Sequence, residues 1–199
     1  MCINKKTITK NSDNVRIVTR EEEAKIVSFL RNSELSKRRA YFSDVADLIE
    51  VLVDTGMRKL EAEELMYGDI DFTANVIRVR QSKSNPRRVP MTGRVAIILK
   101  RRQEENQDKP FSLNDIQLRK AWTWAKDELG ITDPRRLVLH SLRTTCVRRL
   151  MDAGVDLEII CEWLGRHEVR NIHRKAPLPL KKLTEAAKML EQYNLSHLQ

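Results

Sequence analysis

The chain has 199 residues and a formal net charge of +9, from 37 lysines and arginines against 28 acidic residues. A chain of this length can bury the core of one ordinary domain without disulfides or structural metal ions. The excess of basic residues favours a polyanionic partner, although net charge bears on association and not on the fold.

Cysteine usage and hydropathy exclude two further classes of protein. Cys2, Cys146 and Cys161 are odd in number and lack CxxC spacing, which is typical of small core residues and not of a disulfide framework. No apolar run approaches the roughly 18 residues that span a bilayer, and the first ten residues lack the apolar stretch of a signal peptide. We therefore expect an intracellular, reduced protein without membrane contact.

The N-terminal half predicts a flexible lead-in followed by helices. Residues 1–18 are polar and without periodicity, and order is expected from Thr19, which forms a capping box with Glu22 and opens a helix that reaches Leu30. A second helix carries apolar residues at steps of three and four from Val45 onward and stops at Gly56. Residues 61–67 predict a short helix.

The sequence then predicts one small sheet and a helical remainder. Strands are expected at 76–80 and 87–91, with Val76, Arg78 and Arg80 on a basic face and Ile77 and Val79 on a buried face. Further helices are predicted over 93–105, 112–129, 141–153, 156–164 and 180–193. The predicted fold is mainly α with a small antiparallel β-sheet (α+β), with one domain over 19–179 and a C-terminal helix and tail over 180–199.

Familiar catalytic motifs do not occur. The four histidines have no carboxylate or cysteine at ligand spacing, so we predict no metal site. The chain contains neither a GxxxxGK[ST] loop nor a GxSxG elbow, which argues against nucleotide hydrolysis and serine hydrolysis by those routes.

Basic residues at the ends of elements are the better candidates for chemistry. Arg58 follows the glycine that ends a buried helix, and Lys83 lies between two strands. His140 and Arg143 lie in the first turn of a helix, whose dipole favours an anion there. Each alone could be a solvated surface base, but together these residues suit a phosphodiester whose charge rises in a five-coordinate transition state.

Three stretches of the chain resemble the catalytic domain of the tyrosine recombinases, the phage integrase family. TGMRKLEAEELMYGDIDF resembles the first arginine box, SKSNPRRVP the lysine-bearing hairpin, and HSLRTTCVRRLMDAGVDLEIICEWLG the second box with the helices that follow. The resemblance runs from about Thr19 to Leu190. It implies binding of double-stranded DNA, with strand cleavage and rejoining through a 3′-phosphotyrosyl intermediate and without a metal or other cofactor.

The resemblance also implies a role for each matching residue. Arg58 and Arg143 would hold the non-bridging oxygens of the scissile phosphate, Lys83 would protonate the leaving 5′ oxygen, and His140 would assist proton transfer. Glu61 matches an acidic residue that orients the site. Further DNA contacts are expected from basic side chains near these boxes, namely Arg87, Arg88, His167 and Arg174.

Two positions depart from the family pattern. Arg166 stands where the family has His or Trp, and nine residues later Lys175 stands where the family has the nucleophilic tyrosine. An ammonium group is protonated near neutral pH and cannot replace a phenolic oxygen in this step. A register shifted by one places Ala176 there instead. Natural decay, an introduced change, or attack by another residue such as Tyr193 remain open.

Three further questions stay open at this point. The chain is either an enzyme of DNA recombination, disarmed at Lys175, or a non-catalytic DNA-binding protein derived from one. Family members usually carry a second helical domain ahead of the catalytic one, so the chain is expected to be an excised fragment or a truncated relative. The helix over 180–193 would pack on its own core or on a neighbouring protomer of a homo-oligomer assembled on DNA.

Overall fold

A computed structural model of the chain describes residues 16–32, 39, 41–80, 86–105, 109–131, 133, 137–165 and 178–196. In chain order the elements are α2 (Arg20–Leu30), α4 (Tyr41–Thr55), α5 (Lys59–Glu63), the 3₁₀ helix η1 (Tyr67–Asp69), β1 (Ile70–Asp71), β2 (Val76–Val79), β3 (Arg87–Pro90), α6 (Gly93–Glu104), α7 (Asp115–Glu128), α8 (His140–Asp152), α9 (Leu157–Leu164) and α10 (Leu180–Ser196). The predicted fold class, mainly α with one small antiparallel sheet, is confirmed.

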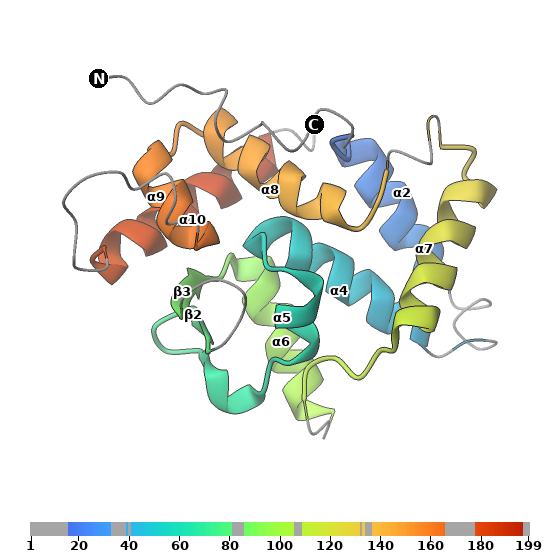
Figure 1. Ribbon diagram of the computed structural model, residues 1–199, viewed down its shortest axis with the longest axis horizontal. Helices are drawn as coiled ribbons and strands as arrows, with labels where there is room; N and C mark the ends of the chain where they lie inside the picture. Colours follow the sequence, from blue (N-terminus) through green and yellow to red (C-terminus); the bar gives the residue numbers. More distant parts are fainter. Residues whose placement is uncertain are drawn as a thin grey trace.

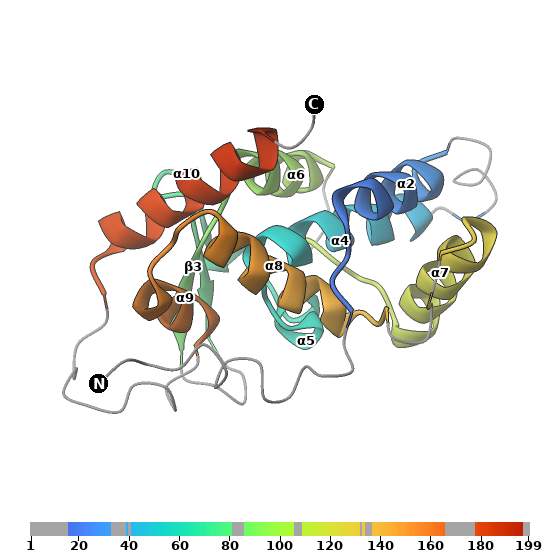
Figure 2. The same ribbon diagram turned by 90° about the horizontal axis from the view of Figure 1, so that it is seen from above.

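Helix α4 is the centre of the molecule (Figure 1). It packs against α2, α6, α7 and α8, and almost every one of its residues is buried, Leu48 and Ile49 among them. Figure 2 shows α6 and α10 on one side of α4 and α5 on the other. The apolar stripe seen in the sequence is therefore only part of the buried surface of α4, because helices pack against α4 on several sides.

The sheet has the strand order β1-β2-β3, and both pairings are antiparallel. Strand β1 escaped the sequence prediction because two residues are too few to show a period of two. Arg78 and Arg80 are exposed as predicted, whereas Val76, which was predicted on the same face, is only 2% exposed. That part of the prediction was wrong: Val76 begins the middle strand, where its cross-strand partners are Asp71 and Pro90.

The ends of two helices follow the predicted chemistry. The Thr19 side chain accepts a hydrogen bond from the Glu22 backbone N–H at the start of α2, and the Glu22 carboxylate accepts one from the Thr19 backbone N–H, which confirms the capping box. Helix α4 ends before Gly56, whose φ is +60°, a conformation that favours glycine. This turn directs the chain from the buried α4 into α5, and Arg58 immediately precedes α5.

Helix α10 lies against its own chain. Leu183, Ala186, Ala187 and Leu190 are buried, and the helix contacts α8, α9 and β3. Of the two placements left open by the sequence, the structure shows the one on the chain's own core. None of the described helices is long and apolar enough to cross a membrane.

We expect Gly56→Ala to destabilise the fold more than Gly130→Ala. Both glycines have φ near +60°, so each alanine pays a backbone cost of roughly 1–2 kcal/mol. A Cβ at Gly56 would in addition lie 3.0 Å from Leu164 Cδ2 and 3.1 Å from Cys146 Sγ, whereas one at Gly130 would meet no described atom within 4 Å. Urea denaturation of the two variants measures the difference, and equal losses of stability would contradict this account of the turn.

Candidate functional site

Three of the residues singled out in the sequence line one pocket. Arg58 enters it from the turn before α5, and His140 and Arg143 enter from the first turn of α8. The pocket has a volume of about 600 Å³. Arg58 lies far from His140 and Arg143 in the sequence, and the fold brings all three to one pocket. Lys83, Arg166, His167, Arg174 and Lys175 lie outside the described residues.

The charged residues that line this pocket are all basic. Besides Arg58 and Arg143 they are Lys59, Arg119 and Lys126, and the remaining lining is His140 with apolar residues and Thr123. Asp115, which is not part of the lining, pairs with Lys59 and with Arg119. A pocket walled by cations and one helix N-terminus suits an anionic group.

Glu61 fixes Arg58 at the edge of the pocket. Its carboxylate accepts one hydrogen bond from the Arg58 backbone N–H at 2.8 Å and one from the guanidinium Nη1 at 2.9 Å. The Arg58 side chain is 37% exposed. Its guanidinium is therefore held by Glu61 through Nη1 while the residue still lines the pocket. The predicted role of Glu61 as an orienting residue fits this arrangement.

Arg87 is buried beside Glu61. Its guanidinium donates to both oxygens of Glu61, at 2.9 Å from Nη1 and 2.6 Å from Nη2, and its Nε donates to the carbonyl of Trp163 at 2.9 Å. The side chain is 1% exposed. In this structure the Arg87 guanidinium is held by Glu61, and the DNA contact expected from the sequence stays a prediction.

Arg88, the neighbouring expected contact, is half-buried and lies on β3. Its Nη2 donates to the carbonyl of Leu178 at 3.0 Å, just ahead of α10. This bond ties the hairpin to the segment that leads into the terminal helix, and it leaves part of the guanidinium at the surface.

Arg143 is held by backbone carbonyls. Its Nη1 donates to the carbonyl of Gly56, and its Nη2 donates to the carbonyl of Leu164 at 2.8 Å. The residue is 4% exposed. The Leu164 carbonyl is one of those left without an intrahelical partner at the end of α9, where the helix dipole favours a cation. Arg143 therefore fastens α8 to the end of α9 and to the turn after α4.

His140 is the exposed first residue of α8. The turn before it is closed by two bonds between Val138 and Ser141, one from the Val138 N–H to Ser141 Oγ at 3.0 Å and one from the Ser141 N–H to the Val138 carbonyl at 2.8 Å. The imidazole is thus presented from a defined helix start, at the pocket wall.

Lys126 and Arg119 were missed by the sequence analysis. Lys126 lies on the buried side of α7 and is 7% exposed, and Arg119 is an exposed residue two turns earlier. Burial lowers the pKa of the Lys126 ammonium group. The available signal was the helical spacing of 119, 122, 123 and 126, which places these side chains on neighbouring positions of one helix.

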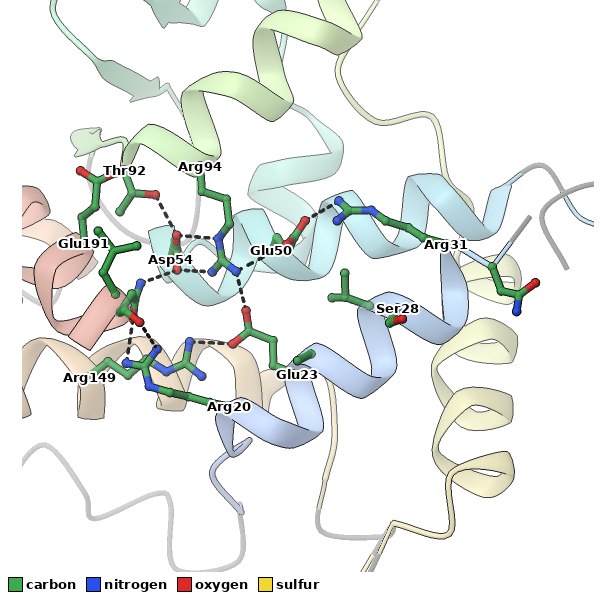
Figure 3. Close-up of a pocket in the computed structure, with 15 residues that line it drawn as sticks. Arg20, Glu23, Ser28, Arg31, Glu50, Asp54, Thr92, Arg94, Arg149 and Glu191 are labelled. Atoms are coloured by element: carbon green, nitrogen blue, oxygen red, sulfur yellow. Dashed lines mark hydrogen bonds and ion pairs between the residues drawn. The ribbon is translucent and has the colours of Figure 1, made fainter. Parts of the chain in front are cut away.

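A second, larger pocket of about 740 Å³ is balanced in charge (Figure 3). Its lining carries four arginines and four carboxylates, namely Arg20, Arg31, Arg94, Arg149, Glu23, Glu50, Asp54 and Glu191. Figure 3 shows Arg94 and Arg149 turned toward Glu23, with nitrogen to oxygen distances of 2.8 and 2.6 Å. Because these charges largely neutralise one another, the smaller, basic pocket is the better candidate for an anion.

The three tyrosines of the chain lie outside the basic pocket. Tyr193, the alternative nucleophile, is on α10, where the Arg20 guanidinium stacks 4.8 Å from its ring centroid and its hydroxyl lies 3.5 Å from Asp152 Oδ2. Tyr41 and Tyr67 pack against the core. Within the described residues, no group of three or more His, Cys, Asp or Glu side chains could hold a metal ion.

We expect Glu61→Gln to cost about 3–5 kcal/mol of folding free energy, because it leaves the buried Arg87 charge without its carboxylate. Adding Arg87→Met should recover part of the loss, since the double variant buries neither charge. Asp152→Asn is the matched control: its pair with Arg148 is exposed and should contribute less than about 1 kcal/mol. Chemical denaturation measures all four proteins, and a loss for Glu61→Gln no larger than the control's would refute the role of the pair.

The known proteins that resemble this chain in sequence are integrases and recombinases. Residues 16–175 match the phage integrase family. The tyrosine recombinase XerC of Corynebacterium glutamicum is 29% identical over 171 residues, which cover 79% of this chain and 54% of that protein. The tyrosine recombinase XerA of Saccharolobus solfataricus is 28% identical over 127 residues, which cover 62% of this chain and 42% of that protein. The chain thus spans about half the length of the curated relatives it matches.

Solved structures share the fold. The Tn1549 transposon integrase in complex with circular intermediate DNA aligns with a TM-score of 0.62 at 17% identity, over 81% of this chain and 64% of that one. The XerH site-specific recombinase bound to its difH substrate aligns with a TM-score of 0.62 at 22% identity, over 88% of this chain and 54% of that one. The family match over most of the chain, together with the arginines that meet in the basic pocket, shows that the chain belongs to the phage integrase family.

Proposed function

We propose that the chain is the DNA-binding catalytic domain of a tyrosine recombinase and that its basic pocket holds a DNA phosphate. The observation that carries this proposal is the lining of the pocket, where Arg58, His140 and Arg143 meet and every charged residue is basic. A phosphodiester in this position would meet guanidinium donors and the N-terminus of α8 together. The relatives named as DNA complexes support duplex DNA as the partner. We also propose an intracellular location, which a DNA substrate would require.

The roles proposed for the two arginines follow from their anchors. Glu61 aligns Arg58, and two backbone carbonyls align Arg143, so neither guanidinium has to be ordered at the moment of binding. Preorganised donors of this kind stabilise charge that develops on phosphate oxygens. His140 lies beside them as the proton-transfer group, and Lys83 is proposed from the family pattern as the acid for the leaving oxygen.

Lys175 bears on whether the chain can cleave DNA. We propose that it occupies the nucleophile position, so that the chain as it stands binds DNA without cleaving it. The placement of the three tyrosines outside the basic pocket supports this, because none of them offers a phenolic oxygen there. The second candidate function, a non-catalytic DNA-binding protein, is favoured by the same observation.

Binding to duplex DNA should weaken steeply with salt, because the pocket contacts the phosphate backbone through lysine and arginine. Arg58→Gln should weaken binding and reduce the slope of log K against log salt by about one. Lys100→Gln makes the same change of charge at an exposed position on α6, outside the pocket, and should leave the slope unchanged. Fluorescence anisotropy across a salt series measures all three slopes. Binding by the unmodified chain that does not respond to salt would exclude the proposed pocket.

Lys175→Tyr should restore covalent attachment to a nicked suicide DNA substrate, while the unmodified chain forms none. The physical reason is that the pocket still supplies charge stabilisation and proton transfer, so the attacking oxygen is the missing part. A denaturing gel detects the covalent band. Tyr193→Phe in the Lys175→Tyr background is the control and should keep the band. A covalent product from the unmodified chain that disappears with Tyr193→Phe would assign the nucleophile to α10 instead.

A further inference from the structure

The larger pocket has as many carboxylates as arginines, but most of its carboxylates are already engaged (Figure 3). Asp54 pairs with Arg94 at 2.6 Å, and Glu23 pairs with the same guanidinium at 2.8 Å. Glu191 accepts a hydrogen bond from the Gly93 backbone N–H at 3.0 Å, at the start of α6. Because of these bonds, equal numbers of charges do not mean that each arginine of the lining has a carboxylate of its own.

Two arginines at the end of this pocket between α2 and α8 are poorly compensated. Arg149 Nη1 pairs with Glu23 at 2.6 Å, and the other oxygen of that carboxylate is taken by another arginine. Arg20 pairs with no carboxylate within the residues that the structure describes. Its guanidinium donates to Asn194 Oδ1 at 3.0 Å and to the Asn194 and Tyr193 carbonyls at 3.2 and 3.4 Å. These are neutral acceptors in the last turn of α10.

Arg149 also has a donor that no described residue accepts. The residue is 5% exposed, and its Nη2 atom is buried and lacks a hydrogen-bond partner among the residues that the structure covers. A buried, charged donor of this kind is stabilised when an acceptor reaches it. The neighbouring Arg20 adds positive charge: burial lowers the pKa of its guanidinium, and the charge of Arg149 lowers that pKa further. Two cations and an unused donor therefore lie at one end of the pocket.

The size and lining of the pocket restrict the anion that fits there. Its volume of about 740 Å³ lies within the range of roughly 300–1,000 Å³ that is usual for small organic ligands. Ala24, Val27 and Leu195 supply apolar contacts. A carboxylate has two oxygens in one plane, which match the donors of a guanidinium group. A polyanion such as DNA would also meet the four carboxylates of the lining, so a single negative charge suits the pocket better.

We propose that the larger pocket is a second ligand site, which binds a small organic monocarboxylate. The carboxylate oxygens accept from Arg149 Nη2 and from the Arg20 guanidinium, and the apolar body of the ligand contacts Ala24 and Val27. The ligand thereby joins α2 to α8. This site is separate from the basic pocket, and the proposal does not depend on the function proposed for that pocket.

Two carboxylates and one neutral analogue serve as probes. Acetate and benzoate carry the proposed group, and benzamide has the shape of benzoate without its charge. Titrations followed by the side-chain Nε–H signals of ¹⁵N-labelled arginine measure binding to the full chain. Arg20→Gln and Arg149→Gln each remove one cation of the site. Lys25→Gln makes the same change of charge at an exposed position of α2 outside the lining, and Arg58→Gln alters the basic pocket instead.

We expect saturable binding of benzoate by the unmodified chain and binding of benzamide that is weaker by roughly tenfold or more, because a charge-assisted hydrogen bond is lost. Arg20→Gln and Arg149→Gln should each weaken benzoate binding by a similar factor, and Lys25→Gln and Arg58→Gln should leave it unchanged. Circular dichroism checks that each variant is folded. Arg20 is only half-buried, so Arg20→Gln decides the question if Arg149→Gln does not fold.

Three results would overturn the proposal. The first is the absence of a saturable response to both acetate and benzoate, which would leave Arg149 Nη2 to water alone. The second is equal binding of benzoate and benzamide, or equal losses for Arg20→Gln and Lys25→Gln. The third is a loss confined to Arg58→Gln, which would assign the carboxylate to the basic pocket. None of these results bears on whether the basic pocket binds DNA, which the salt series tests separately.

Discussion

The carboxylate of Glu61 is the interaction on which the basic pocket depends. One of its oxygens is shared by the guanidinium groups of Arg58 and Arg87, and the other takes the Arg58 backbone N–H and the second nitrogen of Arg87. Arg87 in turn holds the Trp163 carbonyl, so a single side chain joins α5, β3 and the last turn of α9. Since Arg87 carries a charge in a buried place, Glu61 is needed both for folding and for the direction of Arg58.

The linings of the two larger pockets differ in charge. On one side of α4 four arginines face four carboxylates, and those charges hold α2, α4, α6 and α8 together. On the other side the charges in the lining are all basic, and their fixed partners are backbone carbonyls, Glu61 and acids at the rim. Total charge alone could not distinguish these two arrangements, because it does not show that one lining carries both signs while the charged residues of the other lining are all basic.

Local signals in the sequence were enough for most of the fold and for the meeting of Arg58, His140 and Arg143, which lie in motifs with a family pattern. The burial of Arg87 was also available from the sequence, because strand alternation puts it on the same face as the fully buried Val89. The hydrogen bond from Lys126 to the Leu137 carbonyl could not be predicted, because a backbone acceptor leaves no trace in residue type.

The arginines of the pocket serve the fold as well as the ligand. Arg143 joins Gly56 to Leu164, and Arg58 shares Glu61 with the buried Arg87, and each of these ties is made by residues that precede position 175. These ties therefore do not involve residue 175. In evolutionary terms, selection for a folded protein would by itself keep Arg58 and Arg143 in place, whether or not the proposed chemistry occurs.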